Sequence, residues 1–411
     1  MALNVVKVGV VGFGGRAGGV ADTARQVTGG LLEVVGCTEI DDERYEQGCK
    51  HFQCRPTRYP TVEATVDAEK LDGVMIGTPN AFHLEGMRSL KGADVPVFLE
   101  KPLDSTWEKI CDLVRFAESY DGPVMVGHCM RYAPIVRKAS ALIQDGAVGR
   151  VFSFRGVQNC HYGNNMFHGW RRRKDLGGTM WIEKATHDLD VLFALTQTKP
   201  LRLFAISKLQ AFGGDKPDDL HCAVCDERVT CPENIQNIRE RAGANLIPEL
   251  NSHGRKSLCV YSREVDTWDN QACLMHLDDG GFGEYSECYF TARNYHHRIY
   301  ELRGELGTLE IDLGEYEGEL FLASRYGSYR DGYRFHFDYM GRNHYNGDHQ
   351  MVRHLYRFFR GEEGPLTTVK QAFIAETAGY LAVSSSEQDA YLRYEDVVPE
   401  DLRYIWQESL W

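Results

Sequence analysis

An apolar strand that runs directly into a glycine turn is the feature that most restricts how this 411-residue chain can fold. The β-branched run at positions 5–11 predicts a strand buried on both faces. It leads into Gly12, Gly14 and Ala17, spaced as GxGxxA, and then into a helical segment that extends to about Val27. In such a turn the first glycine permits the tight bend, the second lets the backbone approach a pyrophosphate, and the alanine allows close packing. Because the helix also directs free N–H groups at phosphates, the segment predicts a dinucleotide site.

A second predicted strand, LLEVVGCTEID at positions 31–41, carries an acidic residue at its end. Glu39 lies about 20 residues beyond the glycines, where a carboxylate binds the ribose 2′-hydroxyl of a dinucleotide. A carboxylate at that place repels a 2′-phosphate, so NAD is favoured over NADP. The alternative that stays open is a glycine-rich turn in some other α/β protein.

Two more predicted strands end in polar residues, LDGVMIGTPNAFH at positions 71–83 and VPVFLEKPL at positions 95–103. Ligands of open parallel sheets bind at the carboxyl ends of the strands, which is where Thr78, Pro79, Asn80 and Lys101 fall. A lysine beside a nicotinamide could polarise a substrate oxygen. The alternative is a solvated lysine at a strand end with no catalytic role.

The stretch MWIEKATHDLD, at positions 180–190, places Glu183, His187 and Asp190 at spacings of four and three. A helix would bring the three side chains to one face. Two interpretations follow from the spacing alone: the acid–base group of an enzyme, or a solvated helix surface with charges at helical spacing.

Charge and composition exclude several functional classes. The formal net charge of −13 argues against a general nucleic-acid binder. No stretch approaches the roughly 20 apolar residues that a membrane helix needs, and the N-terminus lacks the pattern of a signal peptide. The twelve cysteines are scattered along a long chain, which argues against a disulfide framework. We therefore expect a cytoplasmic protein with no nucleic-acid or membrane partner.

Taken together and in order, these motifs resemble those of the glucose–fructose oxidoreductase/inositol dehydrogenase (Gfo/Idh/MocA) family. The matching segments are GxGxxA at Gly12, TPNAFH at Thr78, EKPL at Glu100, RYAP at Arg131 and GGTMWIEKATHDLD at Gly177. The resemblance implies an α/β fold with an N-terminal Rossmann domain, a doubly wound parallel sheet, at residues 1–126. A C-terminal α+β domain with a large, mainly antiparallel open sheet would follow at residues 127–411.

The pattern of the second half supports that division independently. Alternating residues on either side of an Asp-Asp-Gly-Gly turn predict a hairpin within positions 264–292. RIYELRGELGTLEIDL predicts two more strands, YAPIVRKASALIQDGAVG a helix, and positions 367–388 another helix that packs back on the body. The open sheet of the family often mediates assembly, so the resemblance implies a homodimer or homotetramer.

Site residues carry over from the family to matching positions. Lys101, Glu183 and His187 would be catalytic: the imidazole suits a general base at neutral pH, Glu183 would orient it, and Lys101 would donate to the substrate oxygen. The implied cofactor-binding residues are Gly12, Phe13, Gly14, Gly15, Arg16, Glu39, Thr78, Pro79, Asn80, His83, Glu100, Lys101 and Arg131. The implied substrate-binding residues are Trp170, Arg171, Lys184 and His187.

Two positions depart from the family pattern. Glu183 replaces the usual aspartate, and Lys184 stands where a small or apolar residue is common. An added cation there would bind a substrate carboxylate or change the reaction. Asp190 is expected to fix the helix or His187 from behind. Secondary candidates for pocket residues are Tyr162, His168, His344 and Asp348.

A polar, cysteine-rich segment at about 213–259 has the character of an insertion in the second domain. Cys222, Cys225 and Cys231 form a CxxC followed by a third cysteine, and Cys259 is the best fourth ligand for a structural zinc, with His221 as its substitute. Free, reduced thiols are the competing interpretation, because a second CxxC is missing.

The sequence thus predicts an NAD-dependent oxidoreductase that acts on a CH–OH group of a sugar, polyol or related cyclic compound. One alternative is an NAD-dependent glycosidase that oxidises C3 transiently and eliminates the aglycone. Another is a non-catalytic NAD-binding sensor. The sequence leaves open which sugar and hydroxyl react, the direction in the cell and the number of subunits.

Overall fold

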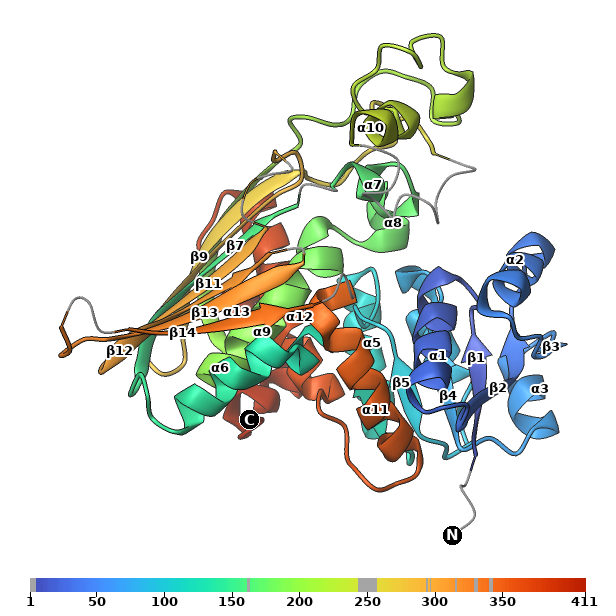
Figure 1. The fold of residues 1–411 in the computed structure, drawn as a ribbon, viewed down its shortest axis with the longest axis horizontal. Coiled ribbons are helices and arrows are strands. Elements are labelled where there is room, and N and C mark those ends of the chain that lie inside the picture. The colour runs from blue at the N-terminus through green and yellow to red at the C-terminus, as the bar shows by residue number, and fades with distance from the viewer. Residues whose placement is uncertain are drawn as a thin grey trace.

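Six parallel strands form the N-terminal sheet, in the order β3-β2-β1-β4-β5-β6 (Figure 1). The strands are β1 (Val6–Val11), β2 (Leu32–Thr38), β3 (Thr57–Tyr59), β4 (Gly73–Ile76), β5 (Val97–Leu99) and β6 (Val124–Val126). Between them lie α1 (Gly15–Val27), α2 (Asp42–Phe52), α3 (Val62–Ala68), α4 (His83–Arg88) and α5 (Trp107–Glu118). The chain steps outward from β1 in both directions, which confirms the predicted doubly wound Rossmann sheet.

The structure is a computed structural model that describes residues 5–160, 163–242, 257–292, 295, 297–314, 316–328, 332–339 and 343–411. Among these residues no helix is both long and apolar enough to cross a membrane.

Nine strands form the second sheet, in the order β14-β13-β12-β11-β7-β10-β9-β8-β15. Only β7 and β10 pair in parallel, so the prediction of a mainly antiparallel open sheet is confirmed. The predicted hairpin corresponds to β9 and β10, and the two strands around the next glycine turn correspond to β11 and β12. The bounds are β7 (Val151–Asn159), β8 (Pro200–Lys208), β9 (Asn270–Leu277), β10 (Phe282–Cys288), β11 (Arg298–Gly304), β12 (Gly307–Leu313), β13 (Glu317–Ser324), β14 (Gly332–Asp338) and β15 (Leu392–Arg393).

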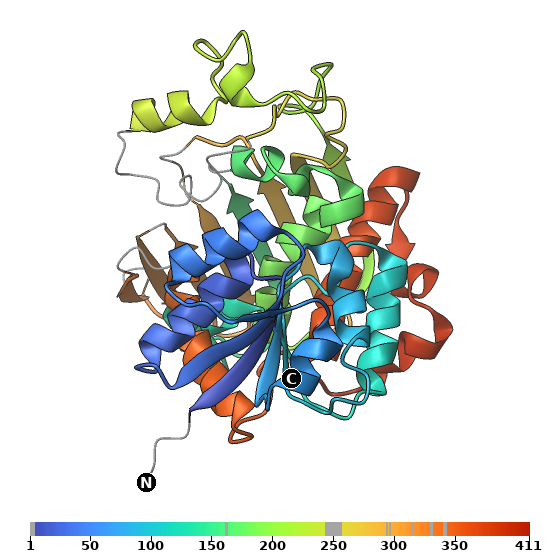
Figure 2. The same cartoon turned by 90° about the vertical axis from the view of Figure 1, so that its right-hand side faces the viewer.

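Helices α6 (Pro134–Gln144), α9 (Thr186–Thr196) and α12 (Val369–Gln388) pack on one face of this sheet. Figure 2 shows the N-terminal layer in front of the larger sheet. The predicted helix at positions 367–388 is α12, which begins with a capping box in which Thr368 and Gln371 satisfy each other's backbone N–H groups. Shorter elements are α7 (Asn164–Phe167), η3 (Trp170–Arg172), α8 (Lys174–Gly177), η4 (Trp181–Ala185), α10 (Ile235–Ala242) and α13 (Tyr394–Val397).

Helix α11 (Gly347–Phe359) joins the two halves of the chain. It comes from the C-terminal half but packs against α1 (Figure 1). Its buried residues Met351, Val352, Leu355 and Phe358 belong to the same apolar cluster as β1 and α1. The predicted division after residue 126 follows β6 directly, yet the Rossmann layer is completed only by this later helix.

A buried carboxylate holds α9 to the sheet. Asp188 accepts hydrogen bonds from Tyr300 (2.5 Å) and Tyr285 (3.1 Å) and pairs with Arg298 (2.5 Å). All four side chains are buried. Since His187 directly precedes Asp188 on α9, this anchor fixes the part of the helix that carries the predicted base.

We expect Asp188→Asn to lower the free energy of unfolding by about 3 kcal/mol, because it leaves the buried Arg298 guanidinium without its counter-charge. Urea denaturation at neutral pH would measure the change. Asp67→Asn, at an exposed position of α3, is the matched control and should change stability by less than about 0.5 kcal/mol. Equal stability of Asp188→Asn and the wild type would contradict this role for the anchor.

Candidate active site

The glycine turn between β1 and α1 leaves open space where a phosphate group would lie. Gly12 has φ +79°, and a Cβ there would meet the Thr78 backbone at 3.0 Å, so the turn requires glycine. A Cβ at Gly14 or Gly15 would meet nothing within 4 Å. No side chain caps the N-terminus of α1. Uncapped N–H groups beside open space fit a bound pyrophosphate.

Glu39 lies at the end of β2, as the sequence predicts. Its carboxylate accepts the N–H of Asp41 at 3.0 Å, and its own backbone carbonyl accepts from Arg58. The next residue, Ile40, is 91% exposed. Glu39 therefore stands at the carboxyl edge of the sheet, in a position suited to a ribose hydroxyl.

Glu183 is the point where three predicted motifs meet. Its Oε2 accepts from Nδ2 of Asn80 at 2.7 Å, and its Oε1 accepts from Nε of Arg171 at 2.5 Å. Nζ of Lys101 lies 3.5 Å from Oε2 and donates to the backbone carbonyl of Glu183 at 2.6 Å. Burial would raise the pKa of this carboxyl, but Lys101, Arg171 and Asn80 together lower it to about 2. Glu183 is therefore an anion that holds two cations in place.

Lys101 is almost fully buried, and burial lowers its pKa while Glu183 opposes that shift. Lys184 and Arg171 lower the pKa further through repulsion. A lysine in this setting is an effective hydrogen-bond donor to an oxygen that gains negative charge.

His187 is buried, and burial holds its pKa well below the usual range, with Lys101, His344 and Lys184 adding repulsion. Its Nδ1 is buried with no hydrogen-bond partner in the described part of the chain. The imidazole is therefore neutral at pH 7 and free to accept a proton.

The backbone between Glu183 and His187 departs from a regular helix. Residues 181–185 form the π-helical turn η4, and α9 continues from Thr186. Single π turns widen a helix and often occur at functional sites. Because every residue from Thr179 to Phe193 is buried, the interpretation of this stretch as a solvated helix surface is wrong. Asp190 binds Nε and Nη2 of Arg131 at 2.7 and 2.5 Å rather than His187.

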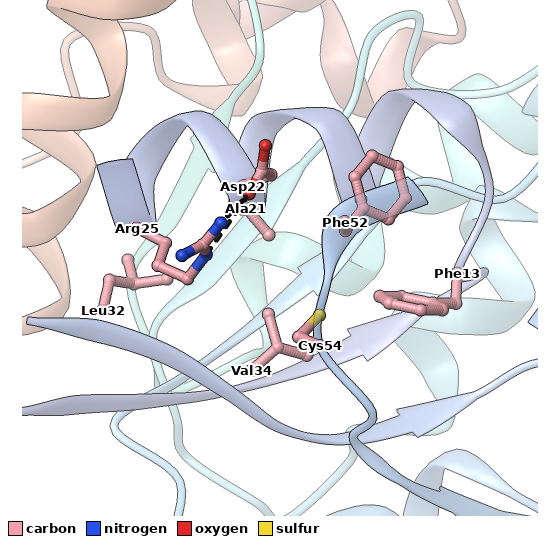
Figure 3. Close-up of a pocket in the computed structure, with 9 residues that line it drawn as sticks. Phe13, Ala21, Asp22, Arg25, Leu32, Val34, Phe52 and Cys54 are labelled. Atoms are coloured by element: carbon pink, nitrogen blue, oxygen red, sulfur yellow. Dashed lines mark hydrogen bonds and ion pairs between the residues drawn. The ribbon is translucent and has the colours of Figure 1, made fainter. Parts of the chain in front are cut away.

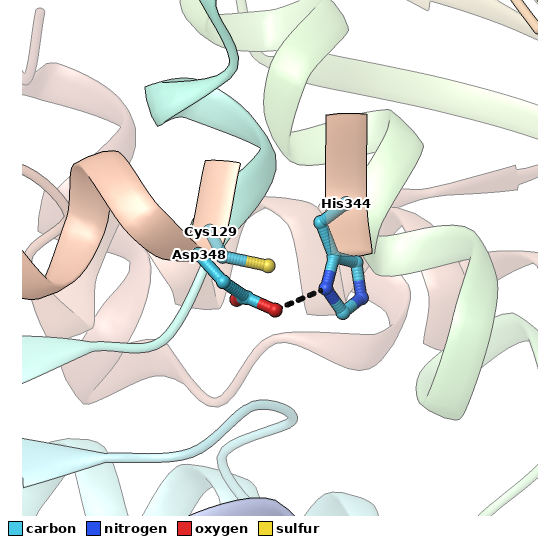
Figure 4. Close-up of side chains that lie close together, drawn as sticks. All are labelled: Cys129, His344 and Asp348. Atoms are coloured by element: carbon cyan, nitrogen blue, oxygen red, sulfur yellow. Dashed lines mark hydrogen bonds and ion pairs between the residues drawn. The ribbon is translucent and has the colours of Figure 1, made fainter. Parts of the chain in front are cut away.

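A second, partly buried network is centred on Asp348, which Figure 4 shows with His344 and Cys129. Asp348 accepts from Nη1 and Nη2 of Arg16 at 2.9 and 3.0 Å and pairs with Nδ1 of His344 at 2.8 Å. Nε of Arg16 is 2.9 Å from Glu100. The ring of His344 lies over that of His187, with centroids 5.4 Å apart and planes at 30°. The sequence marked His344 and Asp348 only as secondary candidates, whereas the structure places them beside the predicted base.

Other predicted residues have varied surroundings. His83 is buried between the carbonyls of Thr78 (3.1 Å) and Pro102 (2.7 Å), so it connects two strand-end loops. Arg171 stacks over the ring of Trp170 at 4.5 Å. His168 contacts the carbonyls of Leu258 and Glu233, which ties it to the cysteine-rich segment instead of the pocket. Tyr162 lies outside the described residues.

Phe13 packs its ring inward against Tyr45 and Phe52. Figure 3 shows it at a small pocket between α1 and β2 that is otherwise lined mainly by apolar side chains, with the Asp22–Arg25 ion pair at its edge. Of the predicted site residues only Phe13 lines this pocket, so it lies apart from Lys101, Glu183 and His187.

Sequence reasoning missed His128 and Cys129, which precede Arg131. His128 is buried 3.7 Å from Asp190, and burial lowers its pKa to about 4. Its ring is edge-on to that of His187 at 6.1 Å. Neither residue belongs to a spacing pattern in the sequence, so only the tertiary structure shows them.

The four predicted zinc ligands lie on adjoining segments. Backbone hydrogen bonds pair residues 220–222 with 257–259, which brings Cys222 and Cys259 onto neighbouring chains. Burial raises the pKa of Cys222 to about 11, with smaller contributions from Cys259, Cys231 and Cys225. Among the described residues, however, no three of these sulfur atoms lie within 4.8 Å of one another. Zinc in this segment stays a prediction, which elemental analysis of the purified protein would check.

The chain is similar to known proteins at the level of family, sequence and structure. A family model described as "Oxidoreductase family, NAD-binding Rossmann fold" matches residues 6–128, and a model of the GFO/IDH/MocA C-terminal domain matches residues 136–310. YteT of Bacillus subtilis is 24% identical over 305 residues, 68% of this chain and 70% of that protein. Inositol 2-dehydrogenase of Corynebacterium glutamicum is 26% identical over 162 residues, 39% of this chain but only 48% of that enzyme. The structure of levoglucosan dehydrogenase with NADH and levoglucosan is 16% identical, with a TM-score of 0.75 over 95% of this chain and 100% of that one.

The lowered pKa of Glu183 has a consequence for stability. A carboxyl whose pKa falls from about 4.3 in the unfolded chain to about 2 in the folded chain stabilises the fold above the higher value and loses that contribution as the pH falls toward the lower. We expect Glu183→Gln to be less stable than the wild type at pH 7, and the difference to shrink below about pH 4. Urea denaturation across this range would measure it, with the exposed Glu63→Gln as control. A difference independent of pH would contradict the assignment.

Proposed function

Since the chain belongs to the glucose–fructose oxidoreductase/inositol dehydrogenase family of oxidoreductases, we propose that it oxidises a secondary hydroxyl of a sugar, polyol or related cyclic compound with NAD. The observation that carries the proposal is the meeting of Lys101, Glu183 and a neutral His187 in one buried cluster next to the open glycine turn.

The cofactor would be held by the carboxyl edge of the N-terminal sheet. The open space over Gly14 and Gly15 and the uncapped α1 N-terminus suit the pyrophosphate, and Glu39 suits an unphosphorylated ribose. We therefore propose NAD over NADP. The bound nicotinamide would supply the acceptor for a hydride.

The side chains around the nicotinamide would orient the substrate and transfer its hydroxyl proton. Lys101 donates to the substrate oxygen and orients the hydroxyl, and His187 takes the proton that the hydroxyl loses. Glu183 positions Lys101 and Arg171 through its carboxylate and, for Lys101, its backbone carbonyl. Because this cluster is buried, water is excluded from the bond that breaks.

The substrate class is supported by the relatives and by the charge of the pocket. The names of similar proteins include inositol 2-dehydrogenase, 1,5-anhydro-D-fructose reductase and levoglucosan dehydrogenase, which are all named for polyols or cyclic sugars. Lys184 and Arg171, with Trp170 beneath the guanidinium, would contact hydroxyl groups of such a substrate.

We further propose that the protein forms a homo-oligomer through the nine-stranded sheet. Helices cover one face of that sheet (Figure 1). The other face carries exposed apolar side chains from the neighbouring strands β8, β9 and β10, namely Ile206, Leu274 and Phe282. Exposed apolar patches on a sheet favour association with a second copy.

The cofactor site is tested by filling the open space. Gly14→Val should fold, because its Cβ meets no atom within 4 Å and φ is −88°, but its side chain should weaken NAD binding by about 100-fold or more. Gly19→Ala, elsewhere on α1 and equally unobstructed, is the matched control. Calorimetry with NAD and NADP would measure both affinities. Undiminished NAD binding by a folded Gly14→Val would refute this location.

The chemistry is tested by following NADH formation with myo-inositol, D-xylose, D-glucose and 1,5-anhydro-D-glucitol. We expect the wild type to oxidise at least one of them, and Lys101→Met and His187→Gln to lower kcat by about 10²- to 10⁴-fold with NAD affinity retained. His336→Gln, at an exposed site on β14, should be unchanged. An inactive wild type that binds NAD would favour the sensor interpretation instead.

A further inference from the structure

The turn that carries His344 has an unusual backbone. Three consecutive non-glycine residues are left-handed, His344, Tyr345 and Asn346, with φ of 50°, 57° and 68°. Such conformations persist only where surrounding contacts hold them, and they concentrate at functional sites. Here the hydroxyl of Tyr345 accepts from Arg298 at 2.8 Å and contacts His297 at 3.0 Å. The strained turn is therefore fixed to the sheet, and it directs the His344 ring toward His187.

The orientation of the His344 ring is set by a chain of charged groups. Its Nδ1 faces Asp348 at 2.8 Å, and both oxygens of Asp348 are bound by Arg16. An aspartate on Nδ1 selects the tautomer that carries its proton there and leaves Nε2 as the acceptor. Arg16 is further fixed by Glu100 at 2.9 Å. The glycine-turn helix thus positions an imidazole in the pocket.

The two imidazoles lie at different depths. His187 is 3% exposed, whereas the side chain of His344 is 27% exposed. Their ring centroids are 5.4 Å apart and their planes are at 30°, so a water molecule at the edge of the two stacked rings would connect a nitrogen of one ring to a nitrogen of the other. The pair therefore leads from the buried His187 toward the more exposed His344.

Cys129, His344 and Asp348 together have the spacing of a metal site, since their ligand atoms all lie within 4.8 Å of one another (Figure 4). The charges disfavour a cation, because Arg16 already occupies both oxygens of Asp348. Burial also raises the pKa of Cys129 well above its usual value, which keeps the thiol neutral. The arrangement suits proton transfer better than metal binding.

We propose that His344 is a second catalytic residue, which takes from His187 the proton lost by the substrate hydroxyl and releases it to solvent, with Asp348 and Arg16 as its positioning residues. The proposal rests on the oxidation proposed above. As the carbon–hydrogen bond gives its hydride to NAD, the O–H proton moves to His187. It then passes through one water molecule to Nε2 of His344 and from there to bulk water, while the proton on Nδ1 stays there, hydrogen-bonded to Asp348.

The surrounding charges give this transfer its direction. Burial disfavours a proton on His187, Lys101 and Lys184 repel it, and its Nδ1 has no hydrogen-bond partner among the residues that the structure describes. Burial lowers the pKa of His344 as well, but the charge and hydrogen bond of Asp348 oppose that shift, while Arg16 and Lys184 add to it. The groups that face His344 are therefore Asp348, Arg16, Lys184, His187 and the neutral Cys129. Of the two rings, His344 is therefore the one on which the proton has the lower free energy.

The test uses the full-length protein with NAD and whichever of the four named polyols and sugars the wild type oxidises fastest. We expect His344→Ala to lower kcat by about 10- to 100-fold with the KM for NAD unchanged, and added imidazole to restore part of the rate. Asp348→Asn should move the acid limb of the kcat profile to lower pH, because it removes the charge that favours protonated His344. His336→Gln, at an exposed site on β14, should keep the wild-type profile.

Each outcome decides between the proposals. Restoration by imidazole supports the relay, since a purely structural role of His344 would not respond to a free base. A His344→Ala or His344→Gln protein with wild-type kcat, or a loss that imidazole does not restore, would overturn the relay and leave the oxidation intact. Loss of activity in Cys129→Ala would favour a metal and also overturn it. A wild type that oxidises none of the four compounds would remove the proposed oxidation, and the relay with it.

Discussion

The geometry of this pocket depends on one buried carboxylate. Glu183 stands in the second half of the chain but is bound by Asn80 and Lys101 from two strand ends of the first half. A buried anion is costly unless cations and donors surround it, so the strand-end loops and the π turn are held in one arrangement. Because that arrangement faces the open glycine turn, closing the two halves around Glu183 also assembles the place where cofactor and substrate would meet.

A second electrostatic feature follows from the first. Lys101, Arg171 and Lys184 surround Glu183 and His187, and burial with this excess of positive charge keeps His187 neutral. Asp348 supplies the balancing negative charge one ring away, beside His344. The two neighbouring imidazoles thus have different surroundings. His187 is buried among cationic side chains, whereas His344 is paired with a carboxylate and lies nearer to solvent. That difference is what allows one group to accept a proton and the other to carry it away.

Much of this could be predicted from local patterns. The strand–glycine turn–helix unit, the hairpin of β9 and β10 and the long helix α12 all lie where periodicity and turn residues placed them, because these signals act over a few neighbouring residues. The π turn at residues 181–185 could not be predicted, since its side chains contact residues distant in the sequence, Asn80 with Glu183 and Ser207 with Trp181. His128 and Cys129 carry no motif, and α11 completes the Rossmann core from a position more than three hundred residues beyond β1. Patterns that extend over a few neighbouring residues cannot predict such long-range contacts.

The sequence by itself determined the two-domain α/β architecture, the glycine turn with its acidic partner Glu39, and the identity of Lys101, Glu183 and His187 as chemically able groups. These depend on residue type and spacing, which the chain carries without folding. Only the tertiary structure decided that Glu183 holds cations in place, that Asp190 binds Arg131, and that His344 lies over His187. These contacts form between residues that are far apart in the sequence. They depend on which side chains the fold buries next to one another and on the charges of those side chains.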